Sequence, residues 1–169
     1  MGTFRRKRPG DPAEALAKAR DPEAARATAV SLLARRDFAS GELRQKLASQ
    51  GYDATVAAAV VAELAEERLL DDARYSENYV AYHAGRGQGP LRIGADLRSL
   101  GVEATLVEAA LDAGPDWREL ARTVRTRKFG AEPPKEWTEK TRQARFLQYR
   151  GFSSDHIRAA TGADFDPDS

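Results

Sequence analysis

The sequence contains no cysteine, which excludes disulfide bonds and thiolate chemistry and is compatible with a reducing cytosol. Its two histidines, His83 and His156, lie far apart and show no metal-ligand spacing with acidic residues, so neither a zinc site nor a histidine-based triad is expected. No apolar run is long enough to cross a membrane, and the basic start of the chain leads into Pro9 and Gly10 rather than into a signal peptide. We therefore predict a cytoplasmic protein that has no catalytic constellation, metal or cofactor and does not enter a membrane.

The net charge is also close to zero, because 27 basic residues nearly balance 26 acidic ones and leave a formal charge of +1. This balance argues against a protein that coats nucleic acid by bulk electrostatics alone. The charges are nonetheless polarised, with a basic arm at residues 5–8 and an acidic end at Asp164, Asp166 and Asp168. Local basic faces are still compatible with this balance.

What the sequence does contain is an internal repeat marked by Gly51, Gly101 and Gly151, which stand at intervals of fifty residues. Each glycine follows a leucine by four residues and precedes an apolar residue. This pattern is typical of a helix that ends on a left-handed glycine, since glycine adopts that conformation without a Cβ penalty and the apolar residue folds back on the leucine. Three matches on one period predict three copies of one helical unit.

Apolar residues recur at helical spacing throughout, and no segment shows the alternation of a β-strand, so the predicted fold is all-α. We expect three tandem three-helix repeats. The periodicity fits either a compact globule or an extended array, and the modest core favours an elongated, curved array. The predicted parts are a basic, flexible tail or frayed lead-in at 1–20, repeats at 21–69, 70–114 and 115–162, and an acidic frayed end at 163–169.

Side chains with oxygen acceptors mark three predicted helix starts. Asp21 precedes Pro22, Asp53 precedes the third helix of the first repeat, and Ser153 precedes a short final helix around Ile157. The acidic pair Asp71-Asp72 resembles a general acid/base or magnesium site, but a helix cap that favours the helix dipole explains it better.

Two further patterns have a structural and a functional interpretation. The loop 85–89 is rich in glycine, yet it lacks the Lys-Ser/Thr pair of a P-loop and follows a predicted helix, which favours a helix connection over a nucleotide site. Tyr75, Tyr79 and Tyr82 share one helix face. Such a stripe is more typical of a core than of a base-stacking platform, although part of it can line an interface.

Arginines supply the strongest hint of a partner. Arg118, Arg122 and Arg125 recur on a face predicted to lie opposite the apolar stripe of Trp117 and Val124, with few acidic residues to balance them. A solvated helix face is the default meaning of such charges, and the shortage of acids favours an anionic partner. These three arginines carry the hypothesis of a module that binds DNA on its own.

Several strings resemble the RecX family of bacterial regulators of the RecA recombinase. They are Leu70 to Ser76, followed by Gly89-Pro90 and by Leu97 to Val102; the upstream stretch Leu33 to Leu43 with Leu47 and Gly51-Tyr52; and the closing Arg145 to Phe152. The motifs agree in order and spacing, and the likeness covers residues 24 to 160.

The resemblance implies a non-enzymatic modulator built of tandem three-helix repeats. Family members bind the RecA–DNA filament and restrain strand exchange, ATP hydrolysis and co-protease activity, so the implied partner is that filament, with direct contact to single- or double-stranded DNA as a further option. The implied signature residues Asp72, Arg74, Tyr75 and Gly101 are expected to be structural, and the protein is expected to be a monomer. From charge, the expected partner-contacting residues are Arg35, Arg36, Arg44, Lys46, Arg86, Arg92, Arg98, Arg122 and Arg125.

Overall fold

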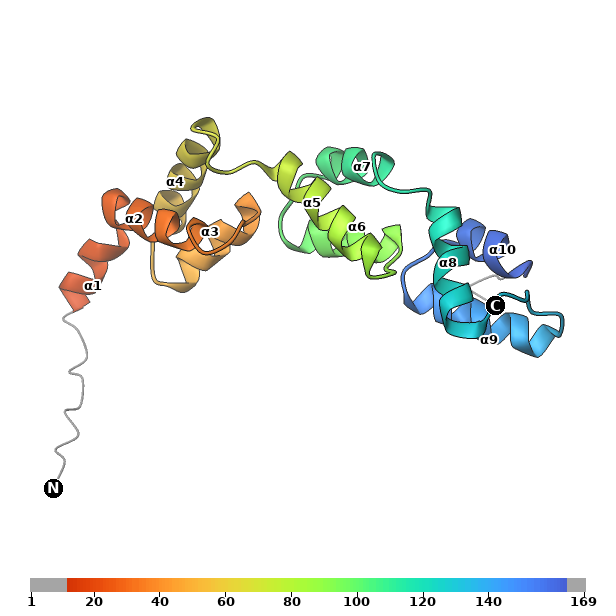
Figure 1. Cartoon of the computed structure of the whole chain (residues 1–169). Helices are drawn as coiled ribbons and strands as arrows, with labels where there is room; N and C mark the ends of the chain where they lie inside the picture. Colours follow the sequence, from red (N-terminus) through yellow and green to blue (C-terminus); the bar gives the residue numbers. More distant parts are fainter. Residues whose placement is uncertain (1–11, 164–169) are drawn as a thin grey trace, which may run out of the picture. The chain divides into compact units, whose positions relative to one another are not determined.

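The structure, a computed structural model, describes residues 12–163 and contains ten α-helices and no strand within them (Figure 1). The all-α prediction is therefore confirmed. The basic arm at 5–8 and the three terminal aspartates lie outside the described residues. The helices are α1 (Pro12–Ala19), α2 (Pro22–Leu33), α3 (Ser40–Ser49), α4 (Ala54–Glu66), α5 (Asp72–Gly85), α6 (Pro90–Ser99), α7 (Ala104–Asp112), α8 (Trp117–Phe129), α9 (Trp137–Tyr149) and α10 (Ser154–Thr161).

The helices after α1 group by threes into α2–α4, α5–α7 and α8–α10, as the repeat predicts. The chain divides into two compact units, Met1–Asp71 and Asp72–Ser169, which we call unit 1 and unit 2. Unit 1 holds the first repeat, whereas unit 2 holds the second and third. The elongated, curved arrangement and the repeat boundaries given above stay predictions.

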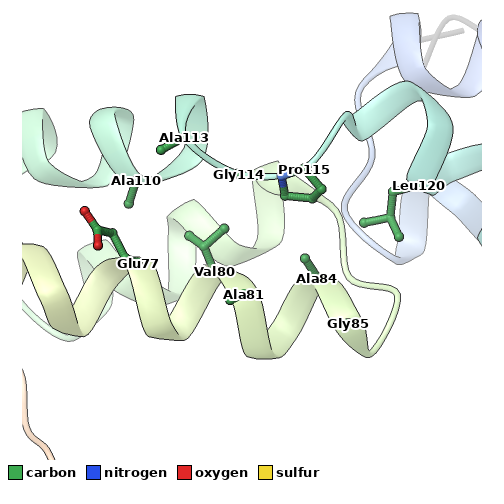
Figure 2. Close-up of a pocket in the computed structure, with 10 residues that line it drawn as sticks. All are labelled: Glu77, Val80, Ala81, Ala84, Gly85, Ala110, Ala113, Gly114, Pro115 and Leu120. Atoms are coloured by element: carbon green, nitrogen blue, oxygen red, sulfur yellow. The ribbon is translucent and has the colours of Figure 1, made fainter.

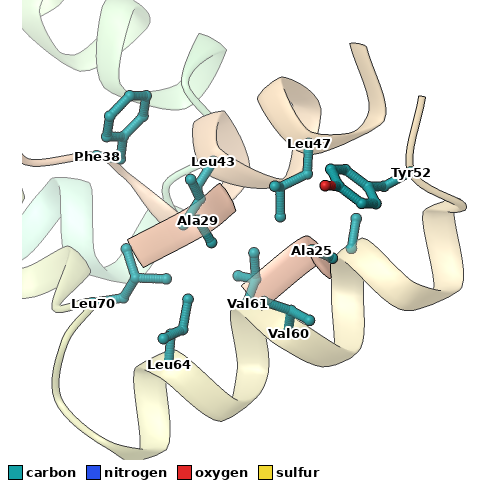
Figure 3. Packing of buried hydrophobic residues seen from close by; sticks show 11 residues of the cluster. Ala25, Ala29, Phe38, Leu43, Leu47, Tyr52, Val60, Val61, Leu64 and Leu70 are labelled. Atoms are coloured by element: carbon teal, nitrogen blue, oxygen red, sulfur yellow. The ribbon is translucent and has the colours of Figure 1, made fainter. Parts of the chain in front are cut away.

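The core of unit 1 forms between the three helices of its repeat (Figure 3). Leu43, Leu47 and Leu64 are fully buried there, and burying each such side chain stabilises the fold by about 1.5–3 kcal/mol. Tyr52 closes one end, with its hydroxyl donating to the carbonyl of Ala24 at 3.1 Å. Small residues on α2 let the helices approach closely enough for this packing.

Helix α1 differs from the expectation of a flexible tail or frayed lead-in over residues 1–20. Four alanines among its eight residues favour a helix, Glu14 lies in its first turn, and Lys18 in its last, where each complements the helix dipole. None of its residues is buried. Its end is nevertheless fixed to the repeat, because the Asp53 N–H donates to the Ala19 carbonyl at 2.8 Å.

The three repeat glycines adopt the predicted left-handed conformation, with φ of 94° at Gly51, 81° at Gly101 and 94° at Gly151. In each case the next residue donates its backbone N–H to the carbonyl of the leucine four residues before the glycine, at 3.1–3.2 Å. The glycine N–H itself bonds the carbonyl three residues back, at 2.9–3.0 Å. This pair of bonds defines the Schellman motif, so the sequence prediction is confirmed at all three corners.

Within unit 2 the third glycine corner also joins two repeats. The Gly89 N–H donates to the Arg150 carbonyl at 2.8 Å, and the Leu91 N–H donates to the Gly151 carbonyl at 3.0 Å. A Cβ built on Gly89 would lie 2.4 Å from the Gly151 backbone, so the two main chains touch directly. The second and third repeats are thus fastened backbone to backbone.

Candidate nucleic-acid and partner interface

The predicted partner-contacting cations of unit 1 are all exposed, but one of them is engaged within the fold. Arg36 forms a bidentate ion pair with Glu42, at 2.6 and 3.1 Å, and its guanidinium lies 3.6 Å from the ring centroid of Phe38. It therefore ties the loop before α3 to that helix. Arg35, Arg44 and Lys46 stay available at the surface.

In unit 2 the predicted cations Arg86, Arg92 and Arg98 are exposed as well. Arg122 is exposed, but its guanidinium already forms an ion pair with Glu119 at 3.2 Å and donates a hydrogen bond to the Ala159 carbonyl at 3.1 Å. It bridges α8 to α10 and has part of its charge neutralised on its own helix. Its role is at least partly structural.

Arg125 does not belong to the surface at all, which corrects the prediction that it contacts a partner. Only 4% of it is exposed. Its guanidinium donates to the carbonyls of Ala131 and Glu132, at 3.1 and 2.9 Å, and so holds the loop after α8. The error is one of helix register: Arg125 stands eight residues after Trp117, on the apolar face rather than opposite it.

A buried polar network supports Arg125. Its guanidinium lies 3.4 Å from the Gln143 Oε1 atom, and the Gln143 amide donates to Glu139 at 2.8 Å. Hydrogen bonds from Arg142 and Gln143 lower the pKa of Glu139. The network links α8 to α9 and fixes the loop between them, so Arg125 is a core residue of the third repeat.

Where the second and third repeats meet, a cavity of about 200 Å³ opens between α8, α9 and the loop after α5. We call it the basic groove. It is lined by Arg86, Gly87, Val124, Arg127, Lys128, Phe146 and Arg150. Of its four cations only Arg86 was in the predicted set. Arg127 and Lys128 had a sequence signal, as basic residues just beyond the arginine face of α8, but Arg150 had none, since only the folded joint brings it beside Arg86.

None of the four groove cations forms an ion pair with a carboxylate of residues 12–163. Arg150 is positioned instead by the Arg86 carbonyl, at 3.3 Å, and by the Phe146 ring, whose centroid lies 5.4 Å from its guanidinium carbon. Phe146 in turn packs edge-on against Phe129 at 5.2 Å. The groove is thus lined by one aromatic ring and by four cations that form no ion pair within the described part of the chain.

The tyrosine stripe of α5 leads toward this groove and is not the core of the repeat, which corrects the preferred interpretation. Ser76, Val80 and Ala84 are the buried residues of α5. Tyr75 and Tyr79 are half-buried with ring centroids 6.0 Å apart, while Tyr82 is 61% exposed. Arg86 lies 5.6 Å from the Tyr82 ring and donates to its hydroxyl at 3.2 Å.

His83 extends the tyrosine stripe, and we call Tyr75, Tyr79, Tyr82 and His83 the aromatic row. It stacks on Tyr79 at 4.1 Å and shares a 2.9 Å hydrogen bond with the Gln88 side chain, which holds the glycine-rich loop. The same loop ends α5 through the bond from the Gly87 N–H to the Ala84 carbonyl, and Gly87 has a φ of 80°. The loop is therefore a helix connection, as expected.

His156 also has a local task. Its backbone N–H lies 3.5 Å from the Ser153 hydroxyl oxygen, while its Nδ1 atom accepts from the Ser153 N–H at 3.3 Å, which makes a capping box at the start of α10. Burial, followed by the nearby positive charge of Arg118, lowers its pKa. The predicted caps Asp21, Asp53 and Ser153 are all confirmed.

A second cavity in unit 2, of about 520 Å³, lies between α5, α7 and the start of α8 (Figure 2). Its walls are apolar, with Val80, Pro115 and Leu120 among them, and Glu77 supplies the one carboxylate of the lining. The lining holds no second titratable side chain that could pair with this carboxylate in acid–base chemistry. Across residues 12–163, no three acidic or histidine side chains cluster as metal ligands would, and no helix is long and apolar enough to span a membrane.

Two of the expected signature residues have visible structural contacts. The Asp72 carbonyl accepts from the Ser76 hydroxyl at 2.6 Å in the first turn of α5, and Tyr75 packs against Tyr79. Gly101 ends α6 in the left-handed conformation. The Asp72 contact is made by its main-chain carbonyl and does not depend on its side chain, so the roles of the Asp72 and Arg74 side chains stay predictions.

Comparison with known proteins identifies the family. Models of the first, second and third three-helix domains of RecX match residues 25–64, 71–111 and 116–161. A "Regulatory protein RecX" of Halorhodospira halophila is 48% identical over 142 residues, which cover 83% of this chain and 88% of that protein. The protein of the same name from Pseudomonas fluorescens is 41% identical over 85% of this chain and 94% of its own length.

Solved structures agree on the fold. The crystal structure of RecX from Lactobacillus salivarius superposes with a TM-score of 0.70 over 88% of this chain and 95% of that one, at 21% identity. A second RecX crystal structure gives a TM-score of 0.68 over 92% of this chain and 79% of that chain. With all three domain models matched in order, this chain belongs to the RecX family of regulatory proteins.

Proposed function

We propose that this chain is a non-enzymatic regulator that binds the RecA–DNA filament and restrains its ATP hydrolysis, strand exchange and co-protease activity. The observation that carries the proposal is the ordered match of all three RecX domains, together with relatives that are named regulatory proteins. The filament and the inhibition are implied by the resemblance described above. The cytoplasmic location is expected from the absence of cysteine, and the monomeric state is a further expectation.

The exposed cations support an anionic partner such as a nucleoprotein filament. After the engaged Arg36 and Arg122 and the buried Arg125 are set aside, six of the predicted contact residues still present their charge to solvent. Charges of this kind steer association and make it sensitive to salt. The six are Arg35, Arg44, Lys46, Arg86, Arg92 and Arg98.

A titration into a RecA ATPase assay on single-stranded DNA tests the proposal. We expect hydrolysis to fall as the protein is added, and we expect the reversal Arg92→Glu with Arg98→Glu to weaken that effect. A matched variant is Arg20→Glu with Arg68→Glu, which makes the same change of net charge at exposed positions outside the predicted contact set. Unchanged hydrolysis, strand exchange and filament binding at micromolar concentrations would contradict the proposal.

The hypothesis of a module that binds DNA through Arg118, Arg122 and Arg125 loses its physical basis, because Arg125 is buried and Arg122 is paired. Nucleic-acid binding without RecA keeps a specific observation in its favour only at the basic groove.

A further inference from the structure

We propose that the acidic segment 164–169 of this chain binds the basic groove of the same molecule and screens the groove cations from other anions. This contact lies within one molecule and needs neither RecA nor DNA, so it goes beyond the proposed function. Three observations support it: the charge of the groove, the point from which α10 delivers the chain, and the composition of the segment.

The groove offers a site for carboxylates that the described part of the chain leaves open. Its cations come from both repeats: Arg86, Arg127, Lys128 and Arg150. No carboxylate within residues 12–163 forms an ion pair with any of them. Three other arginines of the third repeat each pair with an acidic residue of their own helix: Arg122, Arg142 and Arg158. Because a cleft lined by one sign of charge concentrates ions of the opposite sign, the groove favours an anionic occupant.

Helix α10 runs beside α8 in the same direction and carries the chain toward the groove end of α8. Near the start of α8, Arg118 acts together with burial, the larger cause, to lower the pKa of His156. Further along, Arg122 donates to the Ala159 carbonyl at 3.1 Å. Helix α10 then ends at Gly162 in the left-handed conformation, and the next residue, Ala163, is buried. The chain therefore passes into the acidic segment from a fixed point beside the second half of α8.

The acidic segment is long enough to reach the groove from this point. Arg127 and Lys128 stand five and six residues after Arg122, which corresponds to about 7–9 Å along the helix axis. Six residues span up to about 20 Å when extended. The excess lets the segment pass around α8, whose diameter with side chains is about 10–12 Å.

The composition of the acidic segment complements the lining of the groove. The segment has no basic residue and three aspartates: Asp164, Asp166 and Asp168. Three carboxylates thus face a groove of four cations. Phe165 stands between the first two aspartates, and the groove also has two apolar lining residues, Val124 and Phe146. Contact between the Phe165 and Phe146 rings would add to the ion pairs.

Tethering strengthens this contact without any further interaction. A ligand joined to its site by a short stretch of chain has an effective concentration in the millimolar range, so weak, solvated ion pairs are enough to keep the groove occupied. Any external anion then has to displace the segment before it reaches the four cations. The groove is therefore screened by its own chain.

Paramagnetic relaxation in NMR tests the contact, and the absence of cysteine allows one spin label to be placed through Ser169→Cys. In the full chain at low salt, the label should remove most of the amide signals of Arg86, Lys128 and Arg150. These signals should return as ionic strength rises from about 0.01 M to about 1 M, because the screening length falls from about 30 Å to about 3 Å.

Two sets of substitutions separate binding from mere proximity. Replacing the three aspartates by asparagine in the labelled chain gives the signal expected for an unbound segment, so the amide signals should recover. Arg127→Gln/Lys128→Gln should restore them as well. The matched control Arg44→Gln/Lys46→Gln removes the same two residue types from the exposed face of α3 in unit 1 and should leave the signal loss unchanged. Circular dichroism verifies that each variant is folded.

Three results would overturn the proposal. Equal signal loss with the three asparagines would show that the label reaches these amides through the tether alone. Signal loss that persists in Arg127→Gln/Lys128→Gln would place the segment outside the groove. Signal loss in a mixture of spin-labelled and isotope-labelled molecules would assign the contact to a second copy. The sample contains no RecA, so each result leaves the ATPase test of the proposed function unaffected.

Discussion

Unit 1 and unit 2 use the same glycine corner in different surroundings. At Gly51 of unit 1, a Cβ would meet nothing within 4 Å, so only the backbone conformation requires glycine. At Gly151 of unit 2, a Cβ would lie 2.4 Å from the Cβ of Arg92 and 2.8 Å from its backbone nitrogen. The same local motif therefore only terminates a helix in the first repeat. In the third repeat it terminates a helix and also joins two repeats.

The largest effect is expected from Gly151→Ala. The left-handed conformation costs about 1–2 kcal/mol for a residue with a Cβ, and the collision with α6 adds about 1–3 kcal/mol of overpacking. Hydrogen exchange, which reports local opening, should show lost protection at the Gly89 and Leu91 amides. Gly89→Ala isolates the collision, because Gly89 has an ordinary φ of −87°. Normal protection in both variants would contradict the backbone joint.

The next largest effect is expected from Arg125→Met, which is specific to the third repeat. The first helices of the other repeats bury only small or apolar side chains and the Ser76 hydroxyl, whereas α8 buries this guanidinium. Losing its bonds to the loop carbonyls should cost about 2 kcal/mol in the free energy of unfolding. Chemical denaturation measures this, and exposed Arg122→Met should change stability by less than half as much. Equal losses of stability in the two variants would contradict the conclusion that the buried bonds of Arg125 stabilise the third repeat more than the exposed bonds of Arg122.

Gly51→Ala should have a smaller effect, limited to about 1–2 kcal/mol of backbone strain and confined to unit 1. Hydrogen exchange should show reduced protection in α3 and α4 and unchanged protection in unit 2. If Gly51→Ala were as damaging as Gly151→Ala, steric contact would not distinguish the two corners.

The smallest effect is a pH dependence confined to unit 2. Burial lowers the pKa of His156 in the folded protein, so its neutral form is favoured there and accepts the Ser153 N–H. As pH falls below the ordinary value of about 6.5, the unfolded chain gains the proton first and unit 2 loses stability. Unit 1 is capped by Asp21 and Asp53, and hydrogen bonds lower the Asp53 pKa, so its caps should persist to more acidic pH. Hydrogen exchange across this pH range should weaken α10 but not α4, and His156→Gln should abolish the difference.

The local features of this chain could be predicted from sequence because they depend on neighbours in the chain. The three glycine corners, the caps at Asp53 and Ser153 and the all-α fold all follow from residues within one turn of each other. Helix α1 is an exception, because the charges and prolines of residues 1–20 predict a flexible segment although four alanines within the helix favour helix formation. The family could be recognised from sequence because its motifs occur here in the same order and spacing.

The candidate site could be predicted only in part, because it depends on which helix faces meet. Arg86 was identified from charge, but its neighbour Arg150 comes from another repeat and reaches it only through the folded joint. Arg125 is predicted to lie on the exposed face of α8, but it follows the buried Val124 directly and lies on the buried face of the helix. The tyrosine row was assigned to the core, since sequence periodicity alone does not show that Ser76 and Val80 occupy the buried face.

The joint between the second and third repeats consists of main-chain groups, and this limits how the protein can be divided. A chain shortened before Asp116 would leave the Gly89 and Leu91 N–H groups without their acceptors and would uncover the side of α6 that now faces Gly151. Substituting side chains cannot supply those lost acceptors. For truncation, domain exchange or grafting, the smallest portable piece that keeps this joint intact is therefore the pair of repeats rather than either repeat alone.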